Sequence, residues 1–152
     1  MISPEVLRRY SFFGFLNDSG LKALAMIADE VKFEDGAEIL TVKQKADFLY
    51  FMMGGNASNY FIVDEREGYK KLYAGEINPG EIFGISALIQ PHIYTTSVVA
   101  NGNVQAIKID AKTLRAAFEL DARMGFEFMT AVAQALMTRL NDARAQIVIE
   151  QK

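Results

Sequence analysis

The spacing of the apolar residues changes twice along this chain, and that double change constrains the fold more than any other feature. Up to about residue 30, and again from Ala111 onward, apolar residues recur at intervals of three and four. Between these segments they form short runs, many of them β-branched or aromatic, separated by Gly, Asn and Asp. Such runs predict strands, whereas intervals of three and four predict helices. The sequence therefore predicts a mainly β fold, a sandwich or a roll, with flanking helices.

The expected elements follow from these runs and from the turn residues between them. Residues 48–53, FLYFMM, form a continuous apolar run that is typical of a strand buried on both faces. We expect strands at 31–33, 38–40, 48–53, 57–63, 69–74, 82–83, 95–100 and 104–109, with a polar hairpin loop at 64–68 and a turn at 101–103. We expect helices at 4–9, 18–29, 86–89 and 112–120, a break at Gly125, and a long helix from about Phe126 to Val148.

Composition places the chain among ordinary globular domains. Its 152 residues, 51% of them hydrophobic, suit one domain with a sizeable core. We divide it into a helical lead-in (1–30), a β-region (31–110) and C-terminal helices (111–152). The formal net charge of −3 provides no basic field for direct binding of nucleic acid. Because no apolar run approaches the ~20 residues of a membrane span, and no signal-peptide layout opens the chain, we expect a cytoplasmic protein without a membrane partner.

No constellation of catalytic or metal-ligating residues stands out. The absence of cysteine excludes disulfides and thiolate chemistry. His92, the only histidine, lies in a polar loop, and we find no carboxylates placed to complete a metal site with it. Ser86 has no histidine at a spacing that marks a general base. We therefore expect no enzymatic activity, no catalytic residues and no metal.

The stretch from Pro79 to Ala100, PGEIFGISALIQPHIYTTSVVA, carries the strongest functional signal. It predicts a short strand, a break at Gly84, a short helix and, after a loop, a β-branched strand. A helix that opens directly after a glycine directs free backbone N–H groups to one spot, and such a spot favours an anion. A sheet crossover without a ligand is the simpler interpretation of the same pattern.

The residue pattern of this stretch resembles the phosphate-binding cassette of the cyclic-nucleotide-binding domain family, the sensor domain of catabolite-activator-type regulators. That cassette is close to F-G-E-x-A-L, a loop, and then R-[TSA]-A with an apolar strand. Four residues match its first part and six match its strand: Phe83, Gly84, Ala87, Leu88 and Thr95 to Ala100. The family glutamate, which accepts from the ribose 2′-hydroxyl, falls on Ile85. The family arginine, which pairs with the cyclic phosphate, falls on Tyr94.

The resemblance covers about Phe12 to Ile147 and implies a double-stranded β-helix, a jelly-roll-like β-roll, with N-terminal helices and a long C-terminal helix. It also implies a ligand pocket lined by Phe83, Gly84, Ile85, Ser86, Ala87, Tyr94, Thr95 and Thr96. Backbone N–H groups around Gly84 and the two threonine hydroxyls would hold a ligand there. Because both ligand-reading side chains are replaced, we expect weak or absent binding of cAMP and cGMP. A small anionic or nucleotide-like effector remains compatible with the pocket, and Tyr94 is either an aromatic residue at its rim or a replacement contact.

The last helix carries a heptad pattern. Apolar residues repeat at spacings of 4, 3, 4, 3 and 4 over Met129, Ala133, Leu136, Leu140, Ala143 and Ile147. Such a seam is typical of a coiled coil, and a single amphipathic helix on its own roll is the alternative. Phe126, Phe128, Val132 and Met137 lie off the seam and can serve the roll. We expect a parallel homodimer through this seam, as the resemblance also implies.

These observations favour a regulatory, ligand-sensing domain that signals to a downstream effector protein. Two alternatives remain open: a ligand-free dimerisation or interaction module, and the sensor part of a transcription regulator without its DNA-binding domain.

Overall fold

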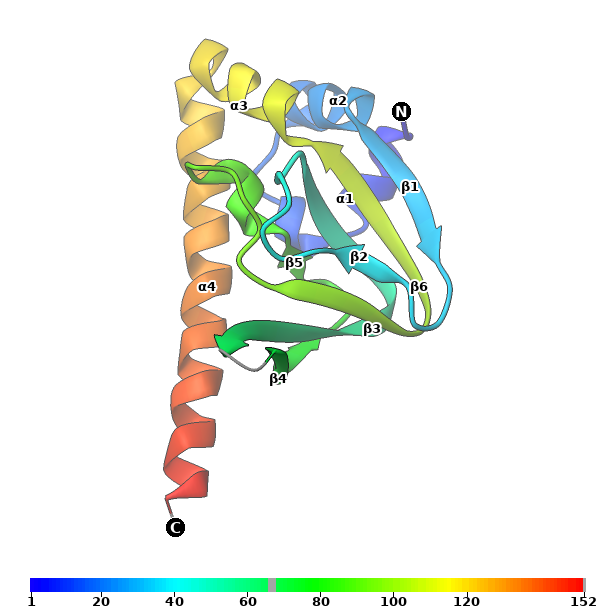
Figure 1. Cartoon of the computed structure of the whole chain (residues 1–152). Coiled ribbons are helices and arrows are strands. Elements are labelled where there is room, and N and C mark those ends of the chain that lie inside the picture. The colour runs from blue at the N-terminus through cyan, green and yellow to red at the C-terminus, as the bar shows by residue number, and fades with distance from the viewer. Residues whose placement is uncertain (66–67, 152) are drawn as a thin grey trace.

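The computed structural model describes residues 1–65 and 68–151. A pair of long antiparallel strands forms its centre (Figure 1). These are β3 (Phe48–Glu65) and β6 (Ser97–Asp110). Strands β1 (Ala28–Phe33) and β2 (Glu38–Leu40) pair with β6, while β4 (Gly68–Ile77) and β5 (Ile82–Phe83) pair with β3. All these pairings are antiparallel. The predicted mainly β fold with flanking helices is confirmed.

Strands β3 and β6 are both irregular where they pair with each other around Gly54. Their register shifts between Met52 and Gly54 and again between Gly54 and Asn56, where Asn56 pairs with Asn101 and Gly54 with Gln105. The extra residues of β6 include Gly102, whose φ of +72° is in the left-handed region. Such bulges bend a strand and increase its twist. The part of β6 after the bulge therefore pairs with β1 and the part before it with β2, while the part of β3 after the bulge pairs with β4.

Strands β3 and β6 each continue through their bulges, so the predicted strand count is too high. Segments 48–53 and 57–63 belong to one strand, and the predicted turn at 101–103 is a bulge inside β6. Sequence periodicity detects the glycine-marked irregularity but cannot distinguish a turn, which ends a strand, from a bulge, which only bends it. The hairpin loop predicted at 64–68 includes residues 66–67, which lie outside the described residues.

The sheet separates two hydrophobic clusters. An inner cluster fills the roll and includes Tyr50 and Met52, whereas an outer cluster lies between the sheet and the helices and includes Leu49 and Phe51. These four successive residues alternate between the clusters and are each at most 5% exposed. The prediction that this strand is buried on both faces is confirmed.

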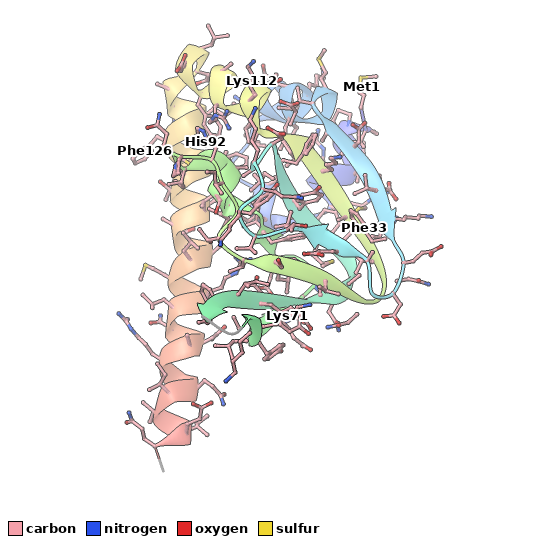
Figure 2. All side chains as sticks on the ribbon, in the orientation of Figure 1. Met1, Phe33, Lys71, His92, Lys112 and Phe126 are labelled. Carbon is pink, nitrogen blue, oxygen red and sulfur yellow. The ribbon has the colours of Figure 1, made fainter. Side chains whose placement is uncertain are left out.

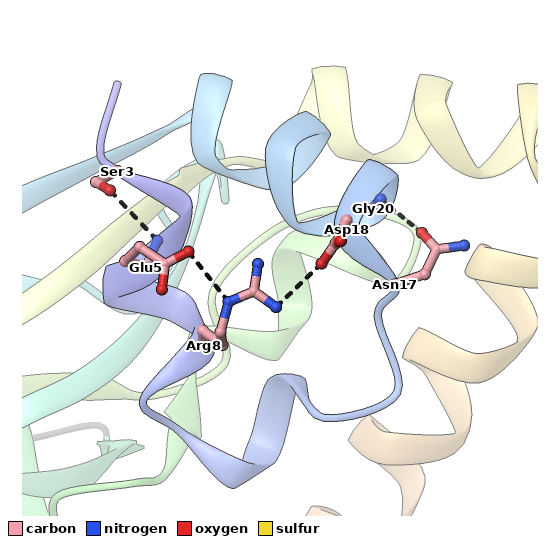
Figure 3. A network of polar contacts seen from close by, with 6 residues as sticks. All are labelled: Ser3, Glu5, Arg8, Asn17, Asp18 and Gly20. Carbon is pink, nitrogen blue, oxygen red and sulfur yellow. Dashed lines mark hydrogen bonds and ion pairs between the residues drawn. The ribbon is translucent and has the colours of Figure 1, made fainter.

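The N-terminal lead-in covers the outer cluster. It comprises α1 (Pro4–Arg8), a 3-10 helix η1 (Ser11–Phe13) and α2 (Asp18–Met26). Arg8 links the first and last of these, since it donates to Glu5 at 3.1 Å and to Asp18 at 3.0 Å (Figure 3). The second predicted helix was expected to run to residue 29, but α2 ends at Met26 because Ala28 already pairs with Ile109 of β6.

Two C-terminal helices complete the fold. Helix α3 (Ala111–Leu120) follows a cap in which Asp110 accepts from the Thr113 amide at 2.8 Å. Helix α4 (Ala122–Glu150) follows a cap in which Asp121 accepts from the Met124 amide at 3.1 Å. The predicted break at Gly125 is wrong, because this residue lies within the first turns of α4. A Cβ at Gly125 would lie 2.9 Å from the Phe118 Cβ, so glycine permits α3 and α4 to pack closely. Helix α4 stands along one side of the roll and continues past β3 and β4 (Figure 1).

The bend at Gly55 provides a test of the fold. Gly55 has a φ of +78°, and a Cβ there would lie 2.3 Å from the Asn103 carbonyl oxygen, whereas the nearest atom to a Cβ on Gly54 is 4.0 Å away. Left-handed strain costs about 1–2 kcal/mol, and overpacking typically adds about 1–3 kcal/mol. We expect Gly55→Ala to lower the free energy of unfolding by about 3 kcal/mol in urea titrations. The matched variant Gly54→Ala should change it by less than about 1 kcal/mol, and equal effects of the two variants would contradict this explanation.

Candidate functional site

The candidate site is a cassette between β5 and β6 that turns on one glycine. Gly84 has a φ of +74° and precedes a 3-10 helix, η2 (Ile85–Leu88). A Cβ on Gly84 would also lie 3.2 Å from the Phe48 carbonyl oxygen. The predicted strand, glycine and short helix are therefore present. In the part of the chain that the structure describes, the backbone N–H groups of Ile85 and Ser86 donate to no backbone carbonyl outside their own helix.

The residues predicted to line the pocket do not all face the same space. Phe83, Ala87 and Tyr94 belong to the inner cluster and are 1%, 0% and 7% exposed. Ile85 packs against the outer cluster instead. Ser86 and Thr96 are half-buried, and Thr95 is exposed.

Tyr94 is held from both its backbone and its side chain. Its amide donates to the Gln44 carbonyl at 2.9 Å, and its own carbonyl accepts from the Lys43 amide at 2.8 Å. Its hydroxyl donates to the Phe48 carbonyl at 2.6 Å. The interpretation of Tyr94 as an aromatic at the rim is therefore wrong, because the ring lies inside the roll.

Tyr94 shares the inner cluster with two other aromatic residues, Tyr50 and Phe83. Tyr50 stacks on Phe83 with ring centroids 5.2 Å apart and an interplanar angle of 15°. Burial, and secondarily the neighbouring Tyr50, raises the pKa of Tyr94 far above its ordinary value. Burial alone raises the pKa of Tyr50 to about 12. This interior therefore disfavours negative charge, since a buried anion needs a cation or several hydrogen-bond donors.

Two arginines hold the cassette from the C-terminal helices. Arg115 of α3 donates to the Ala87 carbonyl at 2.5 Å. Arg139 of α4 donates to the Ile82 carbonyl and lies 3.8 Å from the Glu81 carboxylate. Burial lowers the pKa of Arg139, and Glu81 partly offsets that effect. Sequence reasoning missed both residues, because an arginine on a helix face gives no signal of a contact with a carbonyl far away in the chain.

The strand after the cassette begins later than predicted. We expected it at Thr95, but β6 begins at Ser97, and Thr95 and Thr96 form a bend. Ser97 is 1% exposed, and its hydroxyl accepts from the Val42 amide at 3.0 Å. The side-chain bond at Ser97 thus links the start of β6 to the loop that follows β2.

The predicted seam of α4 lies mostly on a free face. Leu136, Leu140 and Ile147 are 44%, 49% and 54% exposed, and Ala133 and Ala143 are also exposed. Met129 differs, because it is half-buried against the outer cluster.

The residues beside the seam divide into two groups. Phe128 and Val132 face the roll, as predicted, and each is 1% exposed. Phe126 and Met137 do not serve the roll, because they are 73% and 62% exposed, and Figure 2 shows Phe126 on the outer side of α4. Phe126, seven residues before Ala133, extends the exposed apolar face toward the start of α4, and Met137, four residues after Ala133, widens it.

Two further findings describe the rest of the molecule. Among the described residues, no three His, Asp or Glu side chains gather as they would around a metal ion. No helix in this part of the chain is long and apolar enough to span a membrane.

Comparison with known proteins gives consistent matches. The family model described as "Cyclic nucleotide-binding domain" matches residues 30–121. A candidate cyclic nucleotide-binding protein from Geobacter metallireducens, known from a crystal structure, is 36% identical, with a TM-score of 0.80 over 92% of this chain and 99% of that one.

More distant structures share the fold. A cyclic nucleotide-binding domain from Methylobacillus flagellatus has a TM-score of 0.77 at 16% identity, over 96% of this chain and 80% of that one. The sensor domain of the transcriptional regulator DNR from Pseudomonas aeruginosa has a TM-score of 0.71 at 17% identity, over 90% of each chain. The predicted β-roll with a long C-terminal helix is confirmed by these matches.

The buried hydroxyl of Tyr94 has a testable consequence. A tyrosine whose pKa is higher in the folded than in the unfolded chain contributes stability that is complete below about pH 10 and is lost as pH rises above it. We expect the free energy of unfolding to fall above pH 10, by up to about 1.4 kcal/mol per pH unit for each such tyrosine. Tyr94→Phe should cost about 1 kcal/mol at pH 7 through the lost bond to Phe48. It should also reduce the alkaline slope, and the same slope in both proteins would contradict the assignment.

Proposed function

The chain belongs to the cyclic nucleotide-binding domain family, and we propose that it is a regulatory ligand-sensing domain that binds cAMP and cGMP weakly or not at all. The family match and the fold shared with sensor domains of transcription regulators support the regulatory class. The observation that carries the proposed ligand preference is the position of Tyr94. Where the resemblance places the phosphate-pairing arginine, a neutral tyrosine lies inside the roll and binds the Phe48 carbonyl.

The loss of affinity follows from the chemistry of a buried phosphate. An arginine–phosphate pair is charge-assisted and often bidentate, whereas the Tyr94 hydroxyl is already engaged by a backbone carbonyl. Removing one partner of a buried charge pair costs about 2–5 kcal/mol. At ~1.4 kcal/mol per tenfold, this is roughly a 30- to several-thousand-fold loss of affinity. Ile85 adds to the loss, because an alkyl side chain packed against the outer cluster cannot accept from a ribose hydroxyl.

A weaker anion site can persist beside the aromatic interior. The amides of Ile85 and Ser86 and the hydroxyls of Thr95 and Thr96 are the donors that support it. They suit a small anionic or nucleotide-like effector that does not require an arginine. The aromatic filling around Tyr50 and Phe83 favours the second candidate, a ligand-free interaction module that uses the same fold as a scaffold.

We also propose that α4 forms a homodimer. Its exposed apolar face continues from Phe126 through Leu136 and Leu140 to Ile147, along a helix of 29 residues. An isolated helix with such a face would expose a large apolar area to water, and pairing with a second copy buries it. No catalytic step is proposed, and the output of the domain is an interaction with a downstream protein.

Calorimetric titration with cAMP and cGMP tests the ligand preference. We expect no binding at low-micromolar concentration for the wild-type chain. The double variant Ile85→Glu, Tyr94→Arg restores both ligand-reading side chains and should gain binding if the backbone frame of the cassette is competent. Its folding is checked by circular dichroism, because the new arginine replaces a buried tyrosine. Low-micromolar or tighter binding by the wild type would refute the proposal.

Sedimentation equilibrium tests the dimer. We expect the wild type to associate, and Leu136→Glu or Leu140→Glu to weaken association at least a hundredfold, because each would place an unpaired charge in the seam. Gln134→Glu is the matched control, since it adds the same carboxylate at an exposed position of α4 outside the seam. A wild-type monomer at high concentration, or equal association of all variants, would contradict the seam.

A further inference from the structure

A cavity of about 210 Å³ lies between three helices, α2, α3 and the first turns of α4. Each helix contributes one deeply buried residue to its lining, namely Leu24, Leu114 and Phe128, and these are 3%, 1% and 1% exposed. Figure 1 shows α2 and α3 at the same end of the roll, next to the start of α4. None of the cassette residues lines this space, so it is separate from the site described above.

The size of the cavity selects a small molecule over a protein segment. An α-helix about 10 Å wide with a pitch of 5.4 Å occupies roughly 400 Å³ per turn, which exceeds the available volume. An apolar protein cavity of about 150 Å³ is known to remain dry and to bind benzene. The present volume, about 210 Å³, therefore accommodates a molecule of one or two fused rings.

The lining selects a neutral, apolar ligand. Nine of the ten lining residues are apolar, and Thr113 is the exception. A charged group placed among Leu24, Leu114 and Phe128 would lose water without gaining a partner, which is costly. Ala23, Met26 and Thr113 are exposed and form the open side of the space. Met26 is 69% exposed and Met124 is half-buried, so two flexible side chains can adjust around a ligand.

We propose that this cavity binds a neutral, ring-sized apolar molecule, an activity beyond the cassette and its ligands. Because Leu24 belongs to α2 while Met124 and Phe128 belong to α4, the bound molecule contacts both the lead-in and the long helix. Binding therefore stabilises the docking of α4 on the rest of the domain. The site offers the domain a second input that does not require a phosphate or an arginine.

Indole is a suitable neutral probe, and benzoate is its charged counterpart. We expect saturable binding of indole to the wild-type chain in ligand-detected NMR titrations. At tenfold excess over the dissociation constant, we expect a rise in Tm of about 3–6 °C. Benzoate should bind at least tenfold more weakly. No saturable binding of indole, or equal binding of benzoate, would overturn the proposal.

Two filling variants locate the binding site. Ala117→Leu, from α3, and Ala23→Leu, from α2, each add three carbons to residues that line the cavity, and each should weaken indole binding at least tenfold. Ala116→Leu is the matched control, because it adds the same side chain at an exposed neighbouring position outside the lining and should change affinity less than twofold. If both filling variants fold and bind indole like the wild type, the proposal is wrong.

The outcome is independent of the cassette. Tyr94→Phe changes a residue of the inner cluster and alters neither the lining nor its helices, so its indole affinity should match that of the wild type. If the nucleotide predictions fail, the expected binding of indole is unchanged. If indole does not bind, the nucleotide predictions are unchanged.

Discussion

The close approach of β3 and β6 at Gly55 is the constraint on which the rest of the structure depends. The backbone of Gly55 lies against the Asn103 carbonyl so tightly that no side chain fits between them. There both long strands are bulged, and one sheet becomes the two-sided wall of a roll. As a result, alternate residues of β3 serve two separate clusters, one inside the roll and one beneath the helices.

The inner cluster determines what the cassette can bind. Tyr94, Tyr50 and Phe83 fill the roll next to η2, and the Tyr94 hydroxyl is satisfied by the Phe48 carbonyl. In the proposed function, a space that would need a cation to hold a phosphate is occupied by neutral rings. The cassette keeps its backbone turn at Gly84 while the side chains around it contribute to packing. Fold and ligand chemistry are therefore separable in this domain, since the turn depends on one glycine and the ligand contacts depend on two other positions.

The outer cluster and two arginines connect the cassette to the helices. Arg115 and Arg139 bind carbonyls at Ala87 and Ile82, on either side of the cassette glycine. Any shift of the cassette therefore alters contacts of α3 and α4. The apolar cavity lies at the other junction of these helices, against α2. Under the proposed function and the proposed apolar site, two different kinds of ligand bias the same long helix, and the exposed face of that helix is the output surface.

Much of this organisation was determined by local sequence. The apolar run at 48–53, the helix start at Pro4 and the break at Gly84 each depend on neighbouring residues, so the strands, helix starts and cassette turn were predictable. Heptad spacing likewise identified an apolar face of α4, most of which is exposed.

Only the tertiary structure decided the remainder, because it depends on contacts between distant residues. The sequence predicts strand ends at Gly54-Gly55 and at Asn101-Gly102-Asn103, but pairing between β3 and β6 makes both segments bulges. Gly125 read as a helix break, but the Phe118 side chain requires a glycine within α4. The sequence left Tyr94 as either a rim residue or a replacement contact, and only its bond to the Phe48 carbonyl, 46 positions away, shows why its ring lies inside. The sequence thus determined which local elements form, while packing between elements determined which side of each one meets a ligand, a partner or the core.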